Sequence, residues 1–168
     1  MHSDSLAGDV IKGAAAGALA VWVMDRVDWF IWSRQPYEVR RRIEDVRPGA
    51  MDPAHVLANR AAEAFGRDLL PVQPHPVGIA THYALAVLPT VLYALLRRRV
   101  SGVAAGAGTV FGLGLFLAQD EALNSILGLS APQRTYPWQA HARGLLAHLV
   151  LGATAEAALR VLSGAPRR

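Results

Sequence analysis

Long runs without a charged side chain dominate the middle of the sequence. Residues Pro76 to Leu96 are 21 residues without Asp, Glu, Lys or Arg, and Val100 to Gln119 are another 20, with three arginines (97–99) between the two runs. A helix of about 20 apolar residues spans the hydrocarbon core of a bilayer, so this pattern predicts two transmembrane helices joined by a tight basic turn. A soluble four-helix bundle is the alternative, but uncharged flanks of this length are unusual for one.

Two further helices are predicted on either side of this hairpin, over residues 10–32 and 139–162. The first has a clean apolar part over residues 13–24, which Asp25, Arg26 and Asp28 then interrupt. Tryptophans at 29 and 32 follow, where an interfacial belt is expected. We expect Arg26 and Arg143 to reach the interface or to pair with Asp28 and Glu121.

Residues 33–74 form a polar insert that predicts one short amphipathic helix. Asp52 is suited to its N-cap, Pro53 to its first turn and Gly66 to its end. This helix is expected at the membrane surface, with a solvated connector as the alternative and with His55 facing solvent.

Two motifs occur twice, in the same order. The segments GAAAGALAVWVMD (13–25) and GTVFGLGLFLAQD (108–120) both read Gly-x3-Gly-x7-Asp, and HPVGIATH (75–82) and HARGLLAH (141–148) both read His-x2-Gly-x3-His. The chain therefore reads as an all-α fold, a single integral membrane domain over residues 1–168. We predict a four-transmembrane-helix bundle of two parallel-repeat hairpins, 8–99 (with the insert) and 100–163, related by a pseudo-twofold axis along the membrane normal.

The repeat places ionisable groups at matching depths. At 1.5 Å of rise per residue, Asp25, His82, Asp120 and His148 each lie about 10–12 Å inside one interface. We expect them to form one polar layer, one residue from each helix. His75 and His141 form an outer layer two turns nearer the surface.

Ionisable side chains inside a membrane usually bind something or pair with one another. Two aspartates and two imidazoles suit Zn, Mn or Fe(II), with Glu121 as a further carboxylate. Alternatively, His82 and His148 are suited to be axial ligands of a b-type haem. Two other readings remain open: a proton or ion translocator that uses an Asp–His chain, extended by Glu156, and two hydrogen-bonded pairs that only hold the hairpins together.

Composition narrows the function classes. Apolar residues make up 52% of the chain and charged residues 18%, and there is no cysteine, which excludes disulfides and thiolate-ligated metals. The net charge of +4 comes from arginines near the predicted membrane boundaries, which favours lipid head groups over nucleic acid. We find no catalytic motif, so an enzyme is not the favoured reading. The Gly-x3-Gly faces favour a homo-oligomer or a partner within a membrane complex.

The segment GLSAPQRTYPWQAHARGLLAHLVLGATAEAALR (128–160) resembles the YagU-like family of bacterial inner-membrane proteins. The matching features are the Gly-Leu-Ser-Ala-Pro turn, the Pro137-Trp138 pair, and the Ala-His-Leu-Val stretch followed by Glu156. The resemblance implies an inner-membrane location and a link to acid tolerance, and it carries no established chemistry. Both termini are expected in the cytoplasm, because the arginine triplet sits in the shortest loop.

Overall fold

The computed structural model describes residues 6–69, 72–97, 99–100 and 102–164. All regular structure in these ranges is helical, with no strand, as the all-α prediction requires. Within the same ranges, three helices are long and apolar enough to cross a membrane: α1 (Leu6–Arg34), α4 (Pro76–Leu96) and α7 (Trp138–Leu162). They coincide with three of the four helices predicted from the apolar runs.

The predicted third span takes a different form. Its start is a short 3₁₀ turn, η2 (Ala105–Gly108), in which Gly106, Ala107 and Gly108 all have positive φ. The helical path then runs through α5 (Thr109–Leu115), a π-helical segment η3 (Phe116–Leu123) and α6 (Asn124–Ile126). Residues with left-handed backbone cannot be part of a right-handed α-helix. The regular helix therefore begins only at Thr109, later than the start of the apolar run at Val100. A fourth membrane-spanning helix is therefore not confirmed.

The polar insert contains more structure than its sequence suggested. The predicted amphipathic helix is α3 (Pro53–Ala64), and its N-cap is Asp52, whose carboxylate accepts from the backbone N–H of His55. A second helix, α2 (Tyr37–Val46), precedes it, with a 3₁₀ turn η1 (Pro48–Ala50) between them. A last 3₁₀ turn, η4 (Gln133–Thr135), leads into α7.

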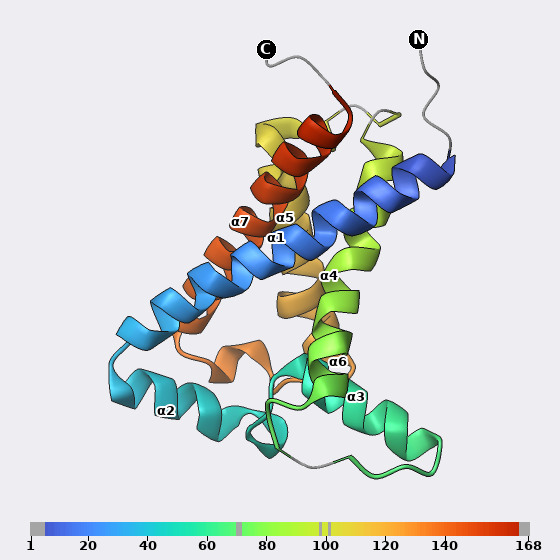
Figure 1. The fold of residues 1–168 in the computed structure, drawn as a ribbon. Helices are drawn as coiled ribbons and strands as arrows, with labels where there is room; N and C mark the ends of the chain where they lie inside the picture. The colour runs from blue at the N-terminus through green and yellow to red at the C-terminus, as the bar shows by residue number, and fades with distance from the viewer. Residues whose placement is uncertain (1–5, 70–71, 98, 101, 165–168) are drawn as a thin grey trace.

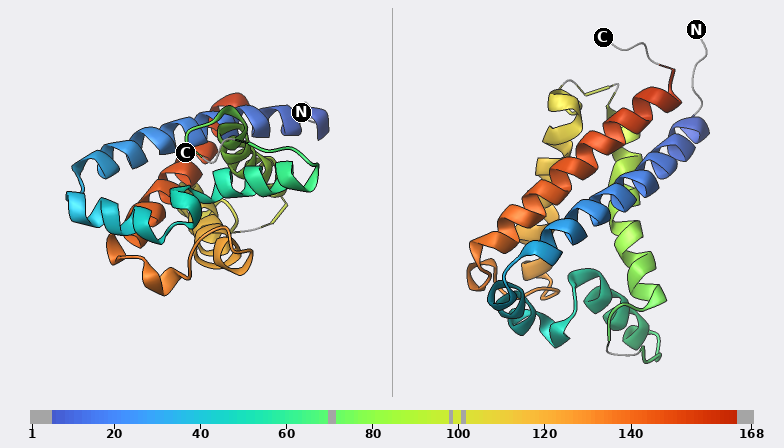
Figure 2. Two further views of the ribbon diagram at one scale, coloured as in Figure 1. Left: turned by 90° about the horizontal axis from the view of Figure 1, so that it is seen from below. Right: turned by 60° about the vertical axis from the view of Figure 1, so that its left-hand side comes forward.

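The long helices alternate in direction (Figure 1). α1 and α5 run away from the end at which α7 finishes, whereas α4 and α7 run towards it. α1 packs against both α4 and α7, and α7 also packs against α5. α2 and α3 lie together across the opposite end of the molecule, as both views in Figure 2 show.

Both Gly-x3-Gly pairs are points of close helix approach. Gly13 and Gly17 lie against α4, where an added Cβ would come within 2.8 Å of the Val91 Cα and 3.0 Å of the Val87 Cα. Gly112 lies against α7, and a Cβ there would overlap the carbonyl oxygen of His148. Each pair thus joins the two helices of one predicted hairpin.

The pseudo-twofold arrangement itself is not confirmed. A twofold axis that related the hairpins would exchange α1 with α5 and α4 with α7. It would therefore require α4 and α5 to pack against each other as extensively as α1 and α7 do. In the described part of the chain α4 and α5 make little contact. The two hairpins therefore share local features without packing symmetrically.

Candidate functional site

One cavity of about 790 Å³ occupies the half of the molecule next to α2 and α3. Its wall includes all four residues of the predicted polar layer: Asp25 from α1, His82 from α4, Asp120 from η3 and His148 from α7. The structure therefore brings the four residues to one cavity. They arrive as two separate pairs, one for each hairpin.

The first pair joins α1 to α4. His82 Nε2 lies 2.9 Å from Asp25 Oδ1, and both side chains are about one third exposed. With Nε2–H donating to the carboxylate, a neutral imidazole keeps its lone pair on Nδ1. A carboxylate behind an imidazole fixes the tautomer and increases the basicity of the other ring nitrogen.

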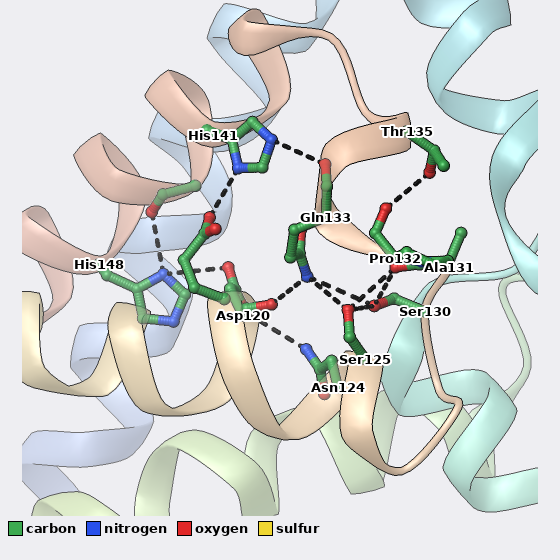
Figure 3. Close-up of polar contacts among 12 residues, drawn as sticks. Asp120, Asn124, Ser125, Ser130, Ala131, Pro132, Gln133, Thr135, His141 and His148 are labelled. Carbon is green, nitrogen blue, oxygen red and sulfur yellow. Dashed lines mark hydrogen bonds and ion pairs between the residues drawn. The ribbon is translucent and has the colours of Figure 1, made fainter.

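The second pair joins η3 to α7 and is looser (Figure 3). His148 Nδ1 donates to the carbonyl oxygen of Gly144 at 2.9 Å and lies 3.6 Å from Asp120 Oδ2. Asn124 donates to the other oxygen of Asp120 at 3.4 Å. The Asp120 carboxylate thus has the Asn124 amide on one side and the His148 imidazole on the other.

The π-helical segment η3 carries three consecutive polar side chains: Gln119, Asp120 and Glu121. A π turn holds more residues than an α turn, and such segments are frequent at functional sites. Here three consecutive side chains of η3 reach different neighbours. Gln119 donates to the Leu85 carbonyl of α4 at 3.0 Å, Asp120 faces His148, and Glu121 contacts His141 on the first turn of α7.

A third ion pair in the cavity wall links α1 to α7. Arg143 donates to Asp28 at 2.7 Å, and its guanidinium lies 4.7 Å from the centre of the Trp32 ring. Asp28 therefore differs from Asp25 and Asp120, because its charge is balanced by a permanent cation.

The two histidines of the predicted outer layer, His75 and His141, have different partners. His75 caps α4: its Nδ1 accepts from the backbone N–H of Gly78 at 3.0 Å. His141 lies 2.7 Å from Glu121 Oε1 and 3.2 Å from the Gln133 carbonyl, beside a second cavity of about 130 Å³ (Figure 3).

The expectation that His55 faces solvent is wrong. Its side chain is buried, with Nδ1 2.9 Å from Asp52 Oδ1 and its ring edge-on to that of His75 at 4.6 Å. Gly78, one turn into α4, leaves the space that the His55 ring fills. These contacts attach α3 to the start of α4 beside the cavity.

The four layer residues do not converge on one point. In the described part of the chain, no group of three or more His, Asp or Glu side chains could hold a metal ion. A metal ligated by three or four of these side chains at once is therefore not preformed there. Each pair still offers one carboxylate and one imidazole to the cavity.

Glu156 belongs to a separate buried cluster at the other end of the bundle. It is only 2% exposed and accepts from the Tyr93 hydroxyl at 2.6 Å, from Arg97 at 2.7 and 2.9 Å, and from Arg160 at 2.6 Å. Burial opposes the charge on Arg97, but its hydrogen bonds with Glu156 and the charge of that carboxylate raise its pKa above the usual value. These contacts make Glu156 a fully hydrogen-bonded structural carboxylate, and it lies away from the Asp–His pairs that the translocator hypothesis has it extend.

Tyr93 and Arg97 are functional-looking residues that the sequence did not predict as part of a site. Two features of the sequence could have indicated this cluster: Arg97 directly follows one apolar run, and Glu156 lies within another. Buried charges are rarely left unpaired, so these two residues could have been expected to pair.

An apolar cluster separates the two polar regions. It contains residues from α1, α4, α5 and α7: Ala20, Val21, Met24, Ala86, Leu115, Ala147, Leu151 and Ala155. Five of these, Met24, Ala86, Leu115, Ala147 and Leu151, also line the cavity. We call this cluster the apolar floor, because it closes the cavity on the side that faces Glu156.

Comparison with protein-family models, with curated proteins and with solved structures gives no match. The resemblance to the YagU-like family stays a prediction from the sequence, and the site is interpreted from its own geometry.

Proposed function

We propose that this chain is an integral protein of the bacterial cytoplasmic membrane and that it binds a small ligand in the cavity beside α2 and α3. In this proposal the helical path from α5 to α6 lies in the membrane with α1, α4 and α7, which gives a four-helix domain of two hairpins. Lipids surround the domain, and a second copy or a larger membrane complex is the proposed partner.

One observation carries the proposal: two carboxylate–imidazole pairs, from different hairpins, line the same cavity. Cavities of about 300–1,000 Å³ with an apolar lining and a few convergent polar groups are typical ligand sites. A purely structural pairing of Asp25 with His82 and Asp120 with His148 has no need of an adjoining cavity of this size.

Among the ligands expected from the sequence, haem fits this geometry better than a bare Zn, Mn or Fe ion. A bare ion needs three or four protein ligands, and the described side chains do not bring three together. A haem iron needs only one or two imidazoles, and His82 and His148 both reach the cavity.

The test is an absorption spectrum and an elemental analysis of the detergent-purified protein, with the His82→Ala/His148→Ala double variant alongside. A Soret band, or near-stoichiometric metal that the variant loses, supports a cofactor bound in the cavity. Mass spectrometry of the same samples detects any other co-purified small molecule. If neither sample yields a bound ligand and none is taken up on titration with haem or Zn²⁺, the cofactor form of the proposal fails.

Proton or ion translocation is the competing function. The cavity and the Glu156 cluster lie on opposite sides of the apolar floor, so translocation needs a second conformation in which the floor opens. Proton flux into liposomes that contain the metal-free protein, abolished by Asp25→Asn, would support this function. A scaffold without a ligand predicts that His82→Ala and His148→Ala cost only stability.

A further inference from the structure

The charges around the cavity are unbalanced. Among the described residues, five carboxylates line it (Asp25, Asp28, Glu44, Asp52 and Asp120), against three guanidinium groups (Arg26, Arg47 and Arg143). While the histidines are neutral, the wall therefore carries an excess of negative charge. A region of negative potential with low-dielectric walls attracts cations and repels anions.

Among the described residues, Asp28 is the only one of these five carboxylates that has an arginine or lysine as an ion-pair partner. Asp25 pairs with His82 at 2.9 Å and Asp120 lies 3.6 Å from His148, whereas Asp28 is bound by Arg143. Neutral imidazoles leave both carboxylate charges uncancelled, since the N–H of His82 donates to Asp25 and the Nδ1–H of His148 donates to the Gly144 carbonyl. A carboxylate charge within a membrane domain is unfavourable unless a cation compensates it, and Asp25 and Asp120 have room for such a cation in the cavity.

The remaining lining suits the body of an organic cation. Trp29, Trp32 and Tyr83 contribute aromatic rings to the wall. The guanidinium of Arg143 already lies over the Trp32 ring at 4.7 Å, which shows that a ring in this wall accommodates a cation. Aromatic faces attract cations, and quaternary ammonium groups are recognised in this way. The apolar floor offers Met24, Leu115 and Leu151 to a hydrophobic substituent.

The geometry points to a lipophilic organic cation, such as a hydrophobic amine or a quaternary onium ion, as the ligand class of this cavity. This inference rests on the proposed function, because it names the ligand for the same cavity. The positive centre lies near Asp25 and Asp120, the aromatic rings flank it, and the apolar body rests on the floor. A bare metal ion would leave the apolar floor unused, and an anion would meet the excess of carboxylates.

The test compares two probes of the same size and shape but opposite charge, tetraphenylphosphonium and tetraphenylborate. Saturable binding to the full chain in detergent is measured by equilibrium dialysis, with detergent alone subtracted. We expect tetraphenylphosphonium to bind at least about tenfold more tightly than tetraphenylborate, as one uncancelled charge contact predicts. Equal binding of both probes would overturn the inference, because apolar contact would then explain it.

The variants Asp25→Asn and Asp120→Asn remove the charge and keep the side-chain shape, and each should weaken phosphonium binding about tenfold or more. The matched control is Asp45→Asn, an exposed position of α2 that does not line the cavity, and it should change binding less than twofold. Circular dichroism of each variant confirms folding. Unchanged binding in both folded cavity variants would contradict the inference.

The two proposals fail separately. A haem or another co-purified ligand, without phosphonium binding, overturns the organic-cation inference and leaves the cavity as the binding site. The absence of every ligand, together with the absence of phosphonium binding, overturns both.

Discussion

Buried charges in this chain differ most in what neutralises them. Glu156 receives hydrogen bonds from Tyr93, Arg97 and Arg160, so its negative charge is fully compensated. Within the described ranges, Asp25 and Asp120 have only imidazoles as ion-pair partners. At the residue scale, we therefore interpret the Glu156 cluster as structural and the two aspartates as part of a binding site.

Glu156→Gln should destabilise the fold, because Arg97 would then be buried without a counter-charge. Removing one partner of a buried ion pair costs about 3 kcal/mol or more of unfolding free energy. Thermal unfolding in detergent measures the change, and Glu38→Gln, at an exposed position of α2, is the control, with an expected change within about 0.5 kcal/mol. Equal melting temperatures for the two variants would show that the Glu156 cluster has no structural role.

The site could be predicted from the sequence only in part at this scale. Repeated motifs at matching depths predicted that Asp25, His82, Asp120 and His148 lie in one polar layer, and in the structure all four line one cavity, which the sequence did not predict. The expectation for His55 was wrong, because its ring fills the space beside Gly78, and the sequence pattern did not predict that His75 would serve as the N-cap of α4. Contacts of that kind depend on where α3 packs, which a local pattern does not encode.

Helix boundaries followed from the sequence wherever charge-free length or capping residues defined them, as for α3 and α4. α2 was missed, although Val39, Ile43 and Val46 recur at the i, i+4, i+7 spacing of an amphipathic helix. Three consecutive arginines (40–42) lie among these apolar positions and made the spacing less evident. The π-helical turn of η3 was not predictable either, because both hairpins carry the same Gly-x3-Gly-x7-Asp spacing and only α1 remains a regular α-helix throughout.

Two glycines on α5 should respond in opposite ways to alanine. A Cβ at Gly112 would collide with the backbone of α7, whereas a Cβ at Gly114 has no atom within 4 Å. Gly112→Ala should therefore destabilise the protein by about 1–3 kcal/mol. Gly114→Ala should be neutral or stabilising by up to about 1 kcal/mol, because alanine is the better helix former.

Thermal unfolding of the two variants tests this difference directly, since they lie on the same helix and have the same chemical change. A loss of stability at Gly114 as large as that at Gly112 would mean that α5 does not pack on α7 as described.

The arrangement of the whole molecule gives it two unlike ends. The start of α1 and the end of α7 lie at one end, beside the Glu156 cluster, and α2 and α3 cover the other (Figure 1). Arg97 and Arg99 also follow α4 at the first end. Since basic loops are retained in the cytoplasm, we expect that end to face the cytoplasm and α3 to face outward.

Single cysteines test this orientation cleanly, because the chain has none of its own. Glu63→Cys lies on the exposed side of α3, and Leu162→Cys lies at the end of α7. In intact spheroplasts a membrane-impermeant maleimide should label the first variant, and should label the second only after permeabilisation. The reverse pattern would invert the topology, and labelling of both from outside would contradict opposite ends.

The apolar floor has an electrical consequence for a protein in an energised membrane. A hydrated cavity that opens to one side of the membrane is close to the electrical potential of that side. Most of the membrane voltage therefore falls across the apolar floor beneath the cavity. The free energy of one elementary charge changes by about 2.3 kcal/mol when the charge crosses a potential difference of 100 mV. A cation held by Asp25 and Asp120 would therefore feel little of the field where it binds, and most of it across the short distance past Met24, Leu115 and Leu151.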